Sequence, residues 1–311
     1  MKILFTADWH IKLGQKNVPV SWAKNRYYNF FDQIYNLESL VDLHIIGGDI
    51  FDRMPNLDEL QLYYDFISQV SVDTIIYPGN HEATKKNHTF LDLLIRSSQK
   101  INKFIQIITD CYETEEFSIL PYNELHKKGV FRKLSKSKPL FTHVRGEIPP
   151  HVHPEIDLDS FKEFPVVFAG DLHAHNNTQR NIVYPGSPMT IDFHRKEVST
   201  GYLIIDTEDW SWNWKSFDLP QLIRQTISSE DQMVPTDYNH TIYELEGDLT
   251  DLANVVNSEL LDKKVVKRST EAALIIENMT LEQELEEYLR YILELDEDNI
   301  IGAMKTYNDY T

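Results

Sequence analysis

The sequence predicts an α/β protein in which a parallel sheet is covered by helices and a second sheet packs on the first. Two observations predict this fold class. Short apolar segments alternate with long amphipathic ones in the first third of the chain, which is the spacing of βαβ units. From about Phe104 the segments become shorter and resemble strands, which a second sheet would accommodate.

The first half of the chain contains three predicted strands and two predicted helices. We expect strands at Lys2–Thr6, Leu43–Ile46 and Thr74–Tyr77, and helices at Trp22–Leu40 and Leu57–Val70. The first helix places Tyr27, Phe30, Phe31, Ile34 and Leu37 on one face. Asn56 is the expected N-cap of the second helix. The turn Pro78–Gly79 ends the third strand.

The second half is predicted to be mostly strand, followed by a small α+β unit. Strands are expected at Ile105–Ile108, Glu116–Leu120, Leu140–His143, Val166–Ala169, Tyr202–Ile205 and Trp212–Phe217. A polar linker, Ser228–Asn239, precedes a strand at Thr241–Leu245, a helix at Leu249–Leu261, a strand at Ala272–Ile276 and a helix at Leu281–Leu295. The predicted domains are therefore residues 1–235 and residues 236–311.

Composition indicates a soluble, cytoplasmic protein. The single cysteine, Cys111, excludes an internal disulfide and favours a reducing compartment. The apolar run Ile3–Phe5 is interrupted by Asp8 and His10, so it is too short for a signal peptide or a membrane span. No membrane partner is expected.

The formal net charge of −19 argues against unaided nonspecific binding of DNA, because duplex phosphates are bound through Lys and Arg. Basic residues nevertheless cluster in two places, at Lys127, Lys128, Arg132, Lys133, Lys136 and Lys138, and at Lys263, Lys264, Lys267 and Arg268. Either cluster is equally consistent with a solvated segment and with a phosphate-contacting surface. A DNA substrate is therefore not excluded.

Metal-ligating residue types follow four of the predicted strands. They are Asp8 and His10, Asp49, Asn80 with His81 and Glu82, and Asp171 with His173. Since ligands of open α/β sheets bind beyond the carboxyl ends of the strands, these side chains should meet at one edge. Each motif alone is ordinary turn chemistry, but their ordered recurrence predicts a site for two divalent ions, which suits phosphate-ester hydrolysis. Asp49, after the pair Gly47–Gly48, is the best bridging carboxylate, and Asn80 offers a neutral oxygen.

These motifs resemble those of the calcineurin-like metallophosphoesterase superfamily. The series comprises Asp-x-His, Gly-Asp-Ile-Phe-Asp at 48–52, Gly-Asn-His-Glu, a strand-end His and Gly-x-x-His. Within that superfamily, Gly-Asp-Ile-Phe-Asp together with Tyr184–Pro188 resembles the SbcD-type nucleases of double-strand-break processing and their viral relatives. The resemblance covers most of residues 1–220. It implies a two-sheet metallophosphoesterase sandwich flanked by helices, with a small C-terminal α+β capping domain.

The resemblance also assigns roles to individual residues. It implies one ion held by Asp8, His10 and His173, a second held by Asn80 and His143, and Asp49 as the bridge. His81 matches the catalytic histidine, which would protonate the departing sugar oxygen or stabilise its charge. Glu82 is expected to orient the His81 ring.

The last motif departs from the pattern Gly-His-x-His. Aligned on Gly170, Asp171 replaces the first histidine and His173 keeps the second; aligned on the histidines, His173 and His175 would be the ligands. We prefer the first register, because the glycine ends the strand and a carboxylate is a good ligand for Mn²⁺ or Mg²⁺.

The sequence thus predicts a Mn²⁺-dependent DNA exonuclease and single-strand endonuclease, with Mg²⁺ or Fe²⁺ as alternative ions. The resemblance implies a homodimer that works as the nuclease subunit of an SbcCD-like complex with an ABC-type coiled-coil ATPase. The chain has no ATP-binding loop, so any ATP dependence must come from that partner. Two alternatives remain, a small-substrate phosphodiesterase on the same scaffold and a non-catalytic metal-dependent scaffold.

Overall fold

The computed structural model describes residues 1–85, 88–266, 279–293 and 295–310. The chain divides into two compact units. The first comprises Met1–Leu245 and Val256–Lys264, and the second comprises Glu246–Val255 and Val265–Thr311. The predicted division into residues 1–235 and 236–311 remains a proposal.

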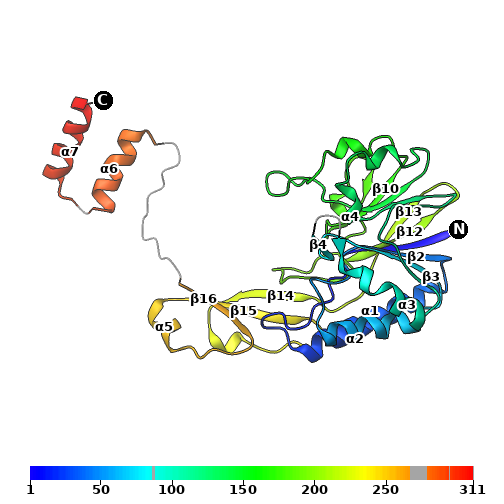
Figure 1. The fold of residues 1–311 in the computed structure, drawn as a ribbon. Coiled ribbons are helices and arrows are strands. Elements are labelled where there is room, and N and C mark those ends of the chain that lie inside the picture. The colour runs from blue at the N-terminus through cyan, green and yellow to red at the C-terminus, as the bar shows by residue number, and fades with distance from the viewer. Residues whose placement is uncertain (86–87, 267–278, 294, 311) are drawn as a thin grey trace. The chain divides into compact units, whose positions relative to one another are not determined.

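The first unit is built on a six-stranded sheet with the order β13-β12-β1-β2-β3-β6 (Figure 1). Its strands are β1 (Lys2–Thr6), β2 (Leu43–Gly47), β3 (Asp73–Tyr77), β6 (Ile105–Ile107), β12 (Gly201–Asp206) and β13 (Trp212–Ser216). The four strands from β1 to β6 are parallel, as the βαβ spacing predicts, and β12 and β13 extend the sheet in antiparallel pairing.

A second, five-stranded sheet has the order β11-β10-β9-β8-β7. It contains β7 (Tyr112–Glu113), β8 (Ser118–Leu120), β9 (Leu140–His143), β10 (Val167–Gly170) and β11 (Ile182–Val183). The strands from β8 to β11 are parallel, and β7 is antiparallel at the edge. The sequence patterns missed β7 and β11, which are two residues long and so show no periodicity.

The two sheets pack through an apolar layer, which confirms the predicted sandwich. Phe141 of β9 lies edge-to-face against Phe5 of β1, with ring centroids 5.3 Å apart, and stacks on Phe168 at 5.1 Å. All three rings are fully buried. Because they alternate with side chains that face the opposite way, each sheet also has a second buried face.

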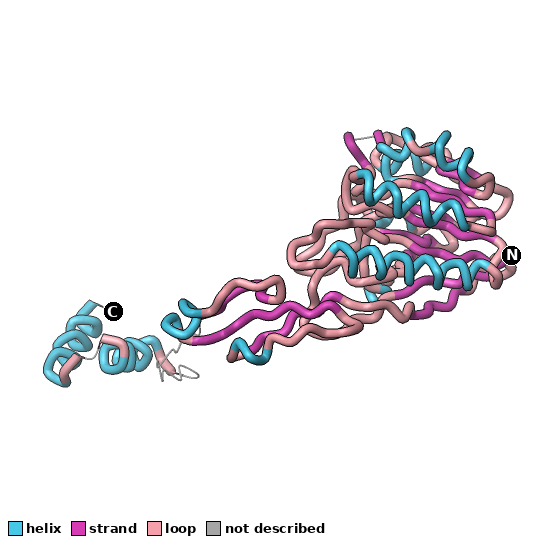
Figure 2. Tube along the Cα trace, turned by 90° about the horizontal axis from the view of Figure 1, so that it is seen from below, coloured by secondary structure: helices cyan, strands magenta, loops and turns pink. Residues whose placement is uncertain are grey.

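Helices cover the outer face of the six-stranded sheet (Figures 1 and 2). They are α1 (Val20–Glu38), α2 (Leu57–Gln69) and α3 (Ile95–Ile101). Asn56 caps α2 as predicted: its side chain accepts from Glu59 N, and the Glu59 side chain accepts from Asn56 N. Phe30, Phe31 and Phe66 pack around the buried Trp9, so the helices hold the segment that leaves β1.

Shorter elements complete the first unit. They are β4 (Ala83–Lys85), β5 (His88–Thr89), α4 (Tyr122–Leu125) and the 3₁₀ helices η1 (Phe90–Leu93), η2 (Val130–Arg132), η3 (Leu158–Phe161), η4 (His175–Asn177) and η5 (Glu230–Gln232). A third sheet has the order β14-β15-β16, with β14 (Leu222–Ile227), β15 (His240–Gly247) and β16 (Leu261–Val266). The sequence analysis missed β14, which pairs in parallel with β15.

The predicted helix Leu249–Leu261 is wrong in extent. Helix α5 (Leu249–Asn254) ends early, because Val255 has extended backbone angles, and Leu261 instead begins β16. The adjacent β-branched residues Val255 and Val256 favour this extended path. The predicted strand Ala272–Ile276 lies outside the described residues.

The chain ends in two helices, where the pattern predicted a single one to Leu295. Helix α6 (Leu281–Tyr291) starts with a capping box formed by Thr280 and Gln283. Helix α7 (Glu297–Tyr310) follows Asp296, whose carboxylate accepts from Asn299 N at 2.9 Å. This capping by Asp296 explains why one helix cannot run through. Within the described part of the chain, no helix is long and apolar enough to cross a membrane.

Candidate metal centre

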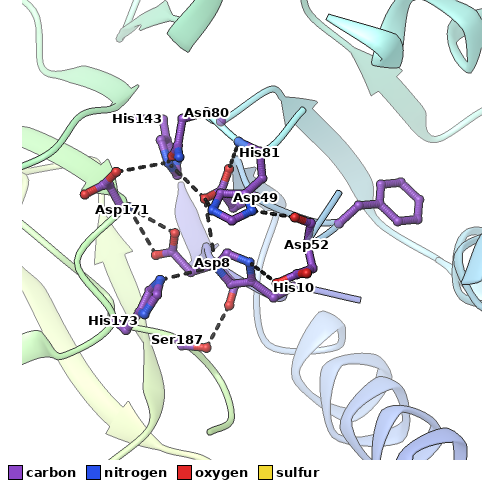
Figure 3. A network of polar contacts seen from close by, with 12 residues as sticks. Asp8, His10, Asp49, Asp52, Asn80, His81, His143, Asp171, His173 and Ser187 are labelled. Atoms are coloured by element: carbon purple, nitrogen blue, oxygen red, sulfur yellow. Dashed lines mark hydrogen bonds and ion pairs between the residues drawn. The ribbon is translucent and has the colours of Figure 1, made fainter. Parts of the chain in front are cut away.

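The eight predicted site residues lie together at the carboxyl ends of strands from both sheets (Figure 3). From the six-stranded sheet come Asp8 and His10 after β1, Asp49 after β2, and Asn80 and His81 after β3. From the five-stranded sheet come His143 at the end of β9, and Asp171 and His173 after β10. The packing of the two sheets therefore assembles the cluster.

One group of donor atoms forms around Asp8. Ligand atoms of Asp8, His10 and His173 lie within 4.8 Å of one another. The ring nitrogens His10 Nε2 and His173 Nε2 are 3.2 Å apart. Burial lowers the pKa of His10 to about 3 and also lowers that of His173, so both rings are neutral and carry a lone pair. Two such lone pairs at this separation suit a shared cation.

A second group forms around Asp49 and His143. Asp49 Oδ2 is 3.4 Å from His143 Nε2 and 3.8 Å from His10 Nε2, so this carboxylate faces both groups. Burial alone would raise the pKa of Asp49, but the hydrogen bond and the attraction of the His143 ring, whose own pKa is raised well above its usual range, outweigh burial and lower the pKa of Asp49. The carboxylate is therefore ionised, as a bridging ligand must be.

The Asn80 amide gives a direct test of whether a cation fits here. Its oxygen lies 2.9 Å from His143 Nε2 and faces only acceptor atoms. With the amide turned, its nitrogen would face His143 Nε2, Asp49 Oδ2 and Asp171 Oδ1 at 2.9, 3.2 and 3.3 Å. Acceptors from four residues thus converge on one point, and a divalent ion satisfies such a set when the amide oxygen points inward.

The His143 ring is oriented by the backbone. Its Nδ1 lies 2.9 Å from the Gly47 carbonyl oxygen. Since a carbonyl only accepts, Nδ1 carries a proton and Nε2 faces the cluster. Burial would lower the pKa of His143, but the carboxylates of Asp49, Asp8 and Asp171 outweigh it and raise the pKa well above its usual range. A metal ion would therefore displace the Nε2 proton and leave the Nδ1-protonated ring that a metal ligand needs.

Four site residues have left-handed backbone angles that non-glycine residues rarely adopt. The φ values are 58° for Asp8, 47° for His10, 51° for Asp49 and 105° for Asp171. Hydrogen bonds hold this strain: Asp8 N donates to Gly48 O at 3.0 Å and His10 N to Asp49 O at 2.9 Å. A Cβ at Gly48 would lie only 2.5 Å from His143 Nδ1, so glycine is required there. Strain of this kind is typical of functional sites.

The predicted role of Glu82 is wrong. Its fully buried carboxylate does not contact the His81 ring but accepts from the backbone N–H groups of Asp49 (2.9 Å), Phe51 (2.9 Å) and Gly79 (2.8 Å). Burial and the nearby Asp49 carboxylate raise the pKa of Glu82 to about 7, against these hydrogen bonds. Glu82 therefore ties the loop after β2 to the loop after β3.

His81 lies at the mouth of the cluster, where its side chain is 37% exposed. Its Nδ1 is 2.5 Å from the Asp52 carbonyl oxygen, so Nδ1 is the donor. Its Nε2 lies 3.9 Å from Asp49 Oδ2, facing the donor groups. The Asp52 carbonyl thus takes the orienting role that was predicted for Glu82.

The structure distinguishes His173 from His175. The His175 Nδ1 bonds Tyr184 O at 2.6 Å, and its ring stacks on Trp214 with centroids 5.3 Å apart. His175 therefore lies outside the cluster, which contains Asp171 and His173. This placement favours the register aligned on Gly170, although the ligand assignment remains a proposal.

Two residues near the site were not found by sequence reasoning. Ser187 Oγ donates to Asp8 O at 2.7 Å, which explains the position of the Gly186–Ser187 segment. Arg145 pairs with Asp171, with Nε 3.3 Å from Oδ2. Its place two residues after the strand-end His143 was the available signal. A cavity of about 520 Å³ opens between this arginine and the cluster.

Three of the six residues of the basic cluster at 127–138 make local contacts. Lys127 pairs with Glu124, Lys136 Nζ lies 3.7 Å from the centre of the Phe164 ring, and Lys138 Nζ donates to Thr114 O at 2.6 Å. In the other cluster, Lys263 pairs with Glu244 at 2.7 Å, while Lys267 and Arg268 lie outside the described residues. These contacts favour a structural role for the four lysines that make them.

Comparisons with known proteins agree with this geometry. The sequence model of the family described as calcineurin-like phosphoesterase matches residues 1–164. The chain is 41% identical to a probable exonuclease subunit 1 of Escherichia phage T5, over the whole of both chains. It is 23% identical to the SbcD component of the SbcCD nuclease of Staphylococcus saprophyticus, covering 67% of this chain and 66% of the relative. It is also 23% identical to a putative phosphoesterase of Invertebrate iridescent virus 3, covering 74% and 70%.

The contacts of Glu82 predict that Glu82→Gln destabilises the fold by about 1–3 kcal/mol, the cost of leaving buried donors unsatisfied. The reason is that Glu82 Oε2 accepts from Asp49 N and Gly79 N while Oε1 accepts from Phe51 N, so a glutamine amide would face a backbone N–H with its NH₂ group in either orientation. Urea unfolding measures the change. The exposed Glu115→Gln is the matched control and should stay within about 0.5 kcal/mol of the parent. Equal stability of the two variants would contradict the role of Glu82.

Proposed function

Since the chain belongs to the calcineurin-like phosphoesterase family and is a metal-dependent phosphodiesterase, we propose that it is a Mn²⁺-dependent DNA nuclease. The proposed actions are exonucleolytic and single-strand endonucleolytic. One observation carries the proposal: carboxylate, amide and imidazole donors from two sheets converge beside an open cavity. The full-length likeness to a chain named as an exonuclease subunit supports DNA as the substrate.

The donor set fits two divalent ions. Asp8, His10 and His173 would hold one ion, Asn80, His143 and Asp171 the other, and Asp49 would bridge them. Oxygen and imidazole donors without thiolate favour Mn²⁺ over softer ions, and Mg²⁺ or Fe²⁺ remain alternatives. When bound, such ions polarise the phosphate and activate the water nucleophile.

His81 is the proposed general acid. With Nδ1 held by the Asp52 carbonyl, only Nε2 is free to give a proton to a substrate. That nitrogen faces the cluster at the exposed mouth of the site, where the departing sugar oxygen would lie. A proton from Nε2 neutralises the charge that develops on this oxygen as the phosphorus–oxygen bond breaks.

A homodimer is proposed through the exposed face of α1 and α2. Most large apolar residues of these helices are buried in the first unit, but Val20, Tyr28 and Leu57 are 46%, 41% and 85% exposed. The ion pair between Lys24 and Asp58, at 3.0 Å, holds the two helices together at this end. A second copy would cover the three side chains and gain their burial.

An ABC-type coiled-coil ATPase is the proposed partner, with α6 and α7 as the docking element. Leu289 and Ile300 are buried, whereas Tyr288, Tyr291 and Ile301 are 46%, 54% and 63% exposed. Exposed apolar side chains on a helix pair suit a helical partner. Two relatives are themselves named as subunits, which supports an assembly of the SbcCD type for this chain.

The nuclease proposal is tested by digesting linear duplex DNA with Mn²⁺ and counting bound ions by calorimetry. We expect His81→Ala to keep its ions and lose cleavage by about 100- to 10,000-fold, the usual contribution of a general acid. Asp49→Ala should lose the bound ions as well as cleavage, because the Asp49 carboxylate faces both groups of donor atoms. His194→Ala is the matched control outside the cluster. Undiminished cleavage by either site variant would refute the mechanism.

The dimer is tested by light scattering at micromolar concentration. The parent should have about twice the mass of the 36.5 kDa chain. Leu57→Glu should shift the population to monomer, because it places a charge on the proposed apolar contact. Leu40→Glu, at the other end of α1 and 65% exposed in the parent, should remain dimeric. A monomeric parent would rule out this assembly.

The partner is tested by co-expression with an SbcC-like ATPase and purification through that ATPase. We expect the double variant Tyr288→Glu and Ile301→Glu to be lost from the complex, while its Mn²⁺-dependent cleavage on its own stays unchanged. The control exchanges the exposed Glu282 for glutamine and the exposed Asp298 for asparagine and should still co-purify. If the double variant still co-purified with the ATPase, α6 and α7 would not be the docking element.

A further inference from the structure

Arg145 occupies a distinct place beside the candidate metal centre. Among the described residues that line its cavity, Arg145 is the one Arg or Lys side chain. The cavity is also lined by Ile148, His151, Val152 and His153 and by residues of the donor cluster. Ile148 and Val152 exchange backbone hydrogen bonds of 3.0 and 2.8 Å, so this wall is an ordered loop.

The backbone that carries Arg145 is fixed on both sides. Before it, Val144 N donates to Gly170 O at 3.2 Å, and Tyr184 Oη donates to Val144 O at 3.1 Å. After it, the Gln179 side chain bonds both Glu147 N (3.0 Å) and Glu147 O (3.1 Å). Such support positions a side chain for binding without further ordering cost.

The Arg145 guanidinium is held by Asp171 yet keeps donors free. Its Nε and Nη2 lie 3.3 and 3.4 Å from the two oxygens of Asp171, which is 6% exposed. The Arg145 side chain itself is 43% exposed. No described residue accepts from its Nη1. Since a guanidinium has five N–H groups, the donors that remain can bind an anion in the cavity.

Charge indicates which kind of anion would bind. The cluster contains Asp8, Asp49 and Asp171, and the chain as a whole carries a formal charge of −19, so a nucleic-acid strand meets carboxylates near the site. A guanidinium binds a phosphate through paired hydrogen bonds. The Asp171 carboxylate, itself part of the donor cluster, contacts Arg145 Nε at 3.3 Å and lies 4.0 Å from His143 Nε2. A guanidinium held on the far side of this carboxylate from the other donors would meet the phosphate next to the scissile one.

We propose that Arg145, held in place by Asp171, binds the phosphate that flanks the scissile one on the substrate strand. Arg145 is then a substrate-positioning residue that favours polynucleotides over small phosphodiesters. This inference rests on the proposed nuclease function.

The first test compares Arg145→Gln with Arg180→Gln. Arg180 is a matched control, because its side chain is 46% exposed and pairs with Asp159 at 2.6 Å. We expect Arg145→Gln to raise KM for a single-stranded oligonucleotide by about 10- to 100-fold, the worth of a charge-assisted contact, with kcat near the parent value. The rate on bis(p-nitrophenyl) phosphate, which has no flanking phosphate, should stay unchanged.

Calorimetry with Mn²⁺ alone distinguishes positioning from structural support. The Arg145→Gln variant should bind Mn²⁺ at least as tightly as the parent, because Asp171 keeps its carboxylate. If Mn²⁺ affinity and the rate on the small diester both fell, Arg145 would be a support of the metal centre and the proposal would be wrong.

A methylphosphonate scan identifies the contacted phosphate. The substrate is an oligonucleotide with a single cleavable bond, in which a methylphosphonate neutralises one flanking phosphate. For the parent protein, this substrate should raise KM by the same factor as Arg145→Gln does with the unmodified substrate. For the Arg145→Gln variant, the methylphosphonate should raise KM no further. Fully additive losses at both flanking positions would overturn the inference. A parent that cleaves no DNA would instead refute the proposed function, so the two failures are distinguishable.

Discussion

The geometry of the metal centre depends on one buried carboxylate that does not itself face the ions. Glu82 accepts hydrogen bonds from Asp49 N, Phe51 N and Gly79 N, and so joins the loops that follow β2 and β3. Asp49 belongs to one of these loops, and Asn80 and His81 belong to the other. Without the carboxylate, three buried N–H groups would need other acceptors, and Asp49, the proposed bridging ligand, would lose its fixed position relative to Asn80.

The backbone conformation also fixes the geometry of the site. Asp8, His10, Asp49 and Asp171 have positive φ angles, and each is held by contacts to a neighbouring loop. Asp171 N, for example, donates to Asp8 Oδ1 at 3.0 Å and joins the two sheets at the cluster. Helices α1 and α2 contribute indirectly, because they enclose Trp9, which lies in the chain between the candidate ligands Asp8 and His10. Preorganisation of this kind lowers the reorganisation needed when ions bind.

The sequence correctly predicted those elements whose structure is determined by residues close together in the chain. The strands β1, β2, β3 and β9 and the capped helix α2 follow from apolar periodicity, and most residues of the candidate metal centre were indicated by polar residues at strand ends, whereas His143 was indicated by the family resemblance. The wrong or missed predictions concern residues whose positions depend on contacts with distant parts of the chain. Glu82 follows His81 in the chain, but the loop turns its carboxylate inward to backbone donors. Arg145 has no motif of its own, since its role depends on Asp171 of the next strand. The two-residue strands and the end of α5 gave too little periodicity.

The proposed ligands come from two sheets that are far apart in the chain, and the cluster can therefore form only late in folding. Asp8, His10, Asp49 and Asn80 are present once the first eighty residues are made, yet the set is incomplete until β9 and β10 have packed on β1 and β2. On the proposed assignment, a nascent or partly folded chain would lack hydrolytic capacity. Bound ions would afterwards connect the two layers of the sandwich, so ion loss and local opening of β9 and β10 should be thermodynamically linked.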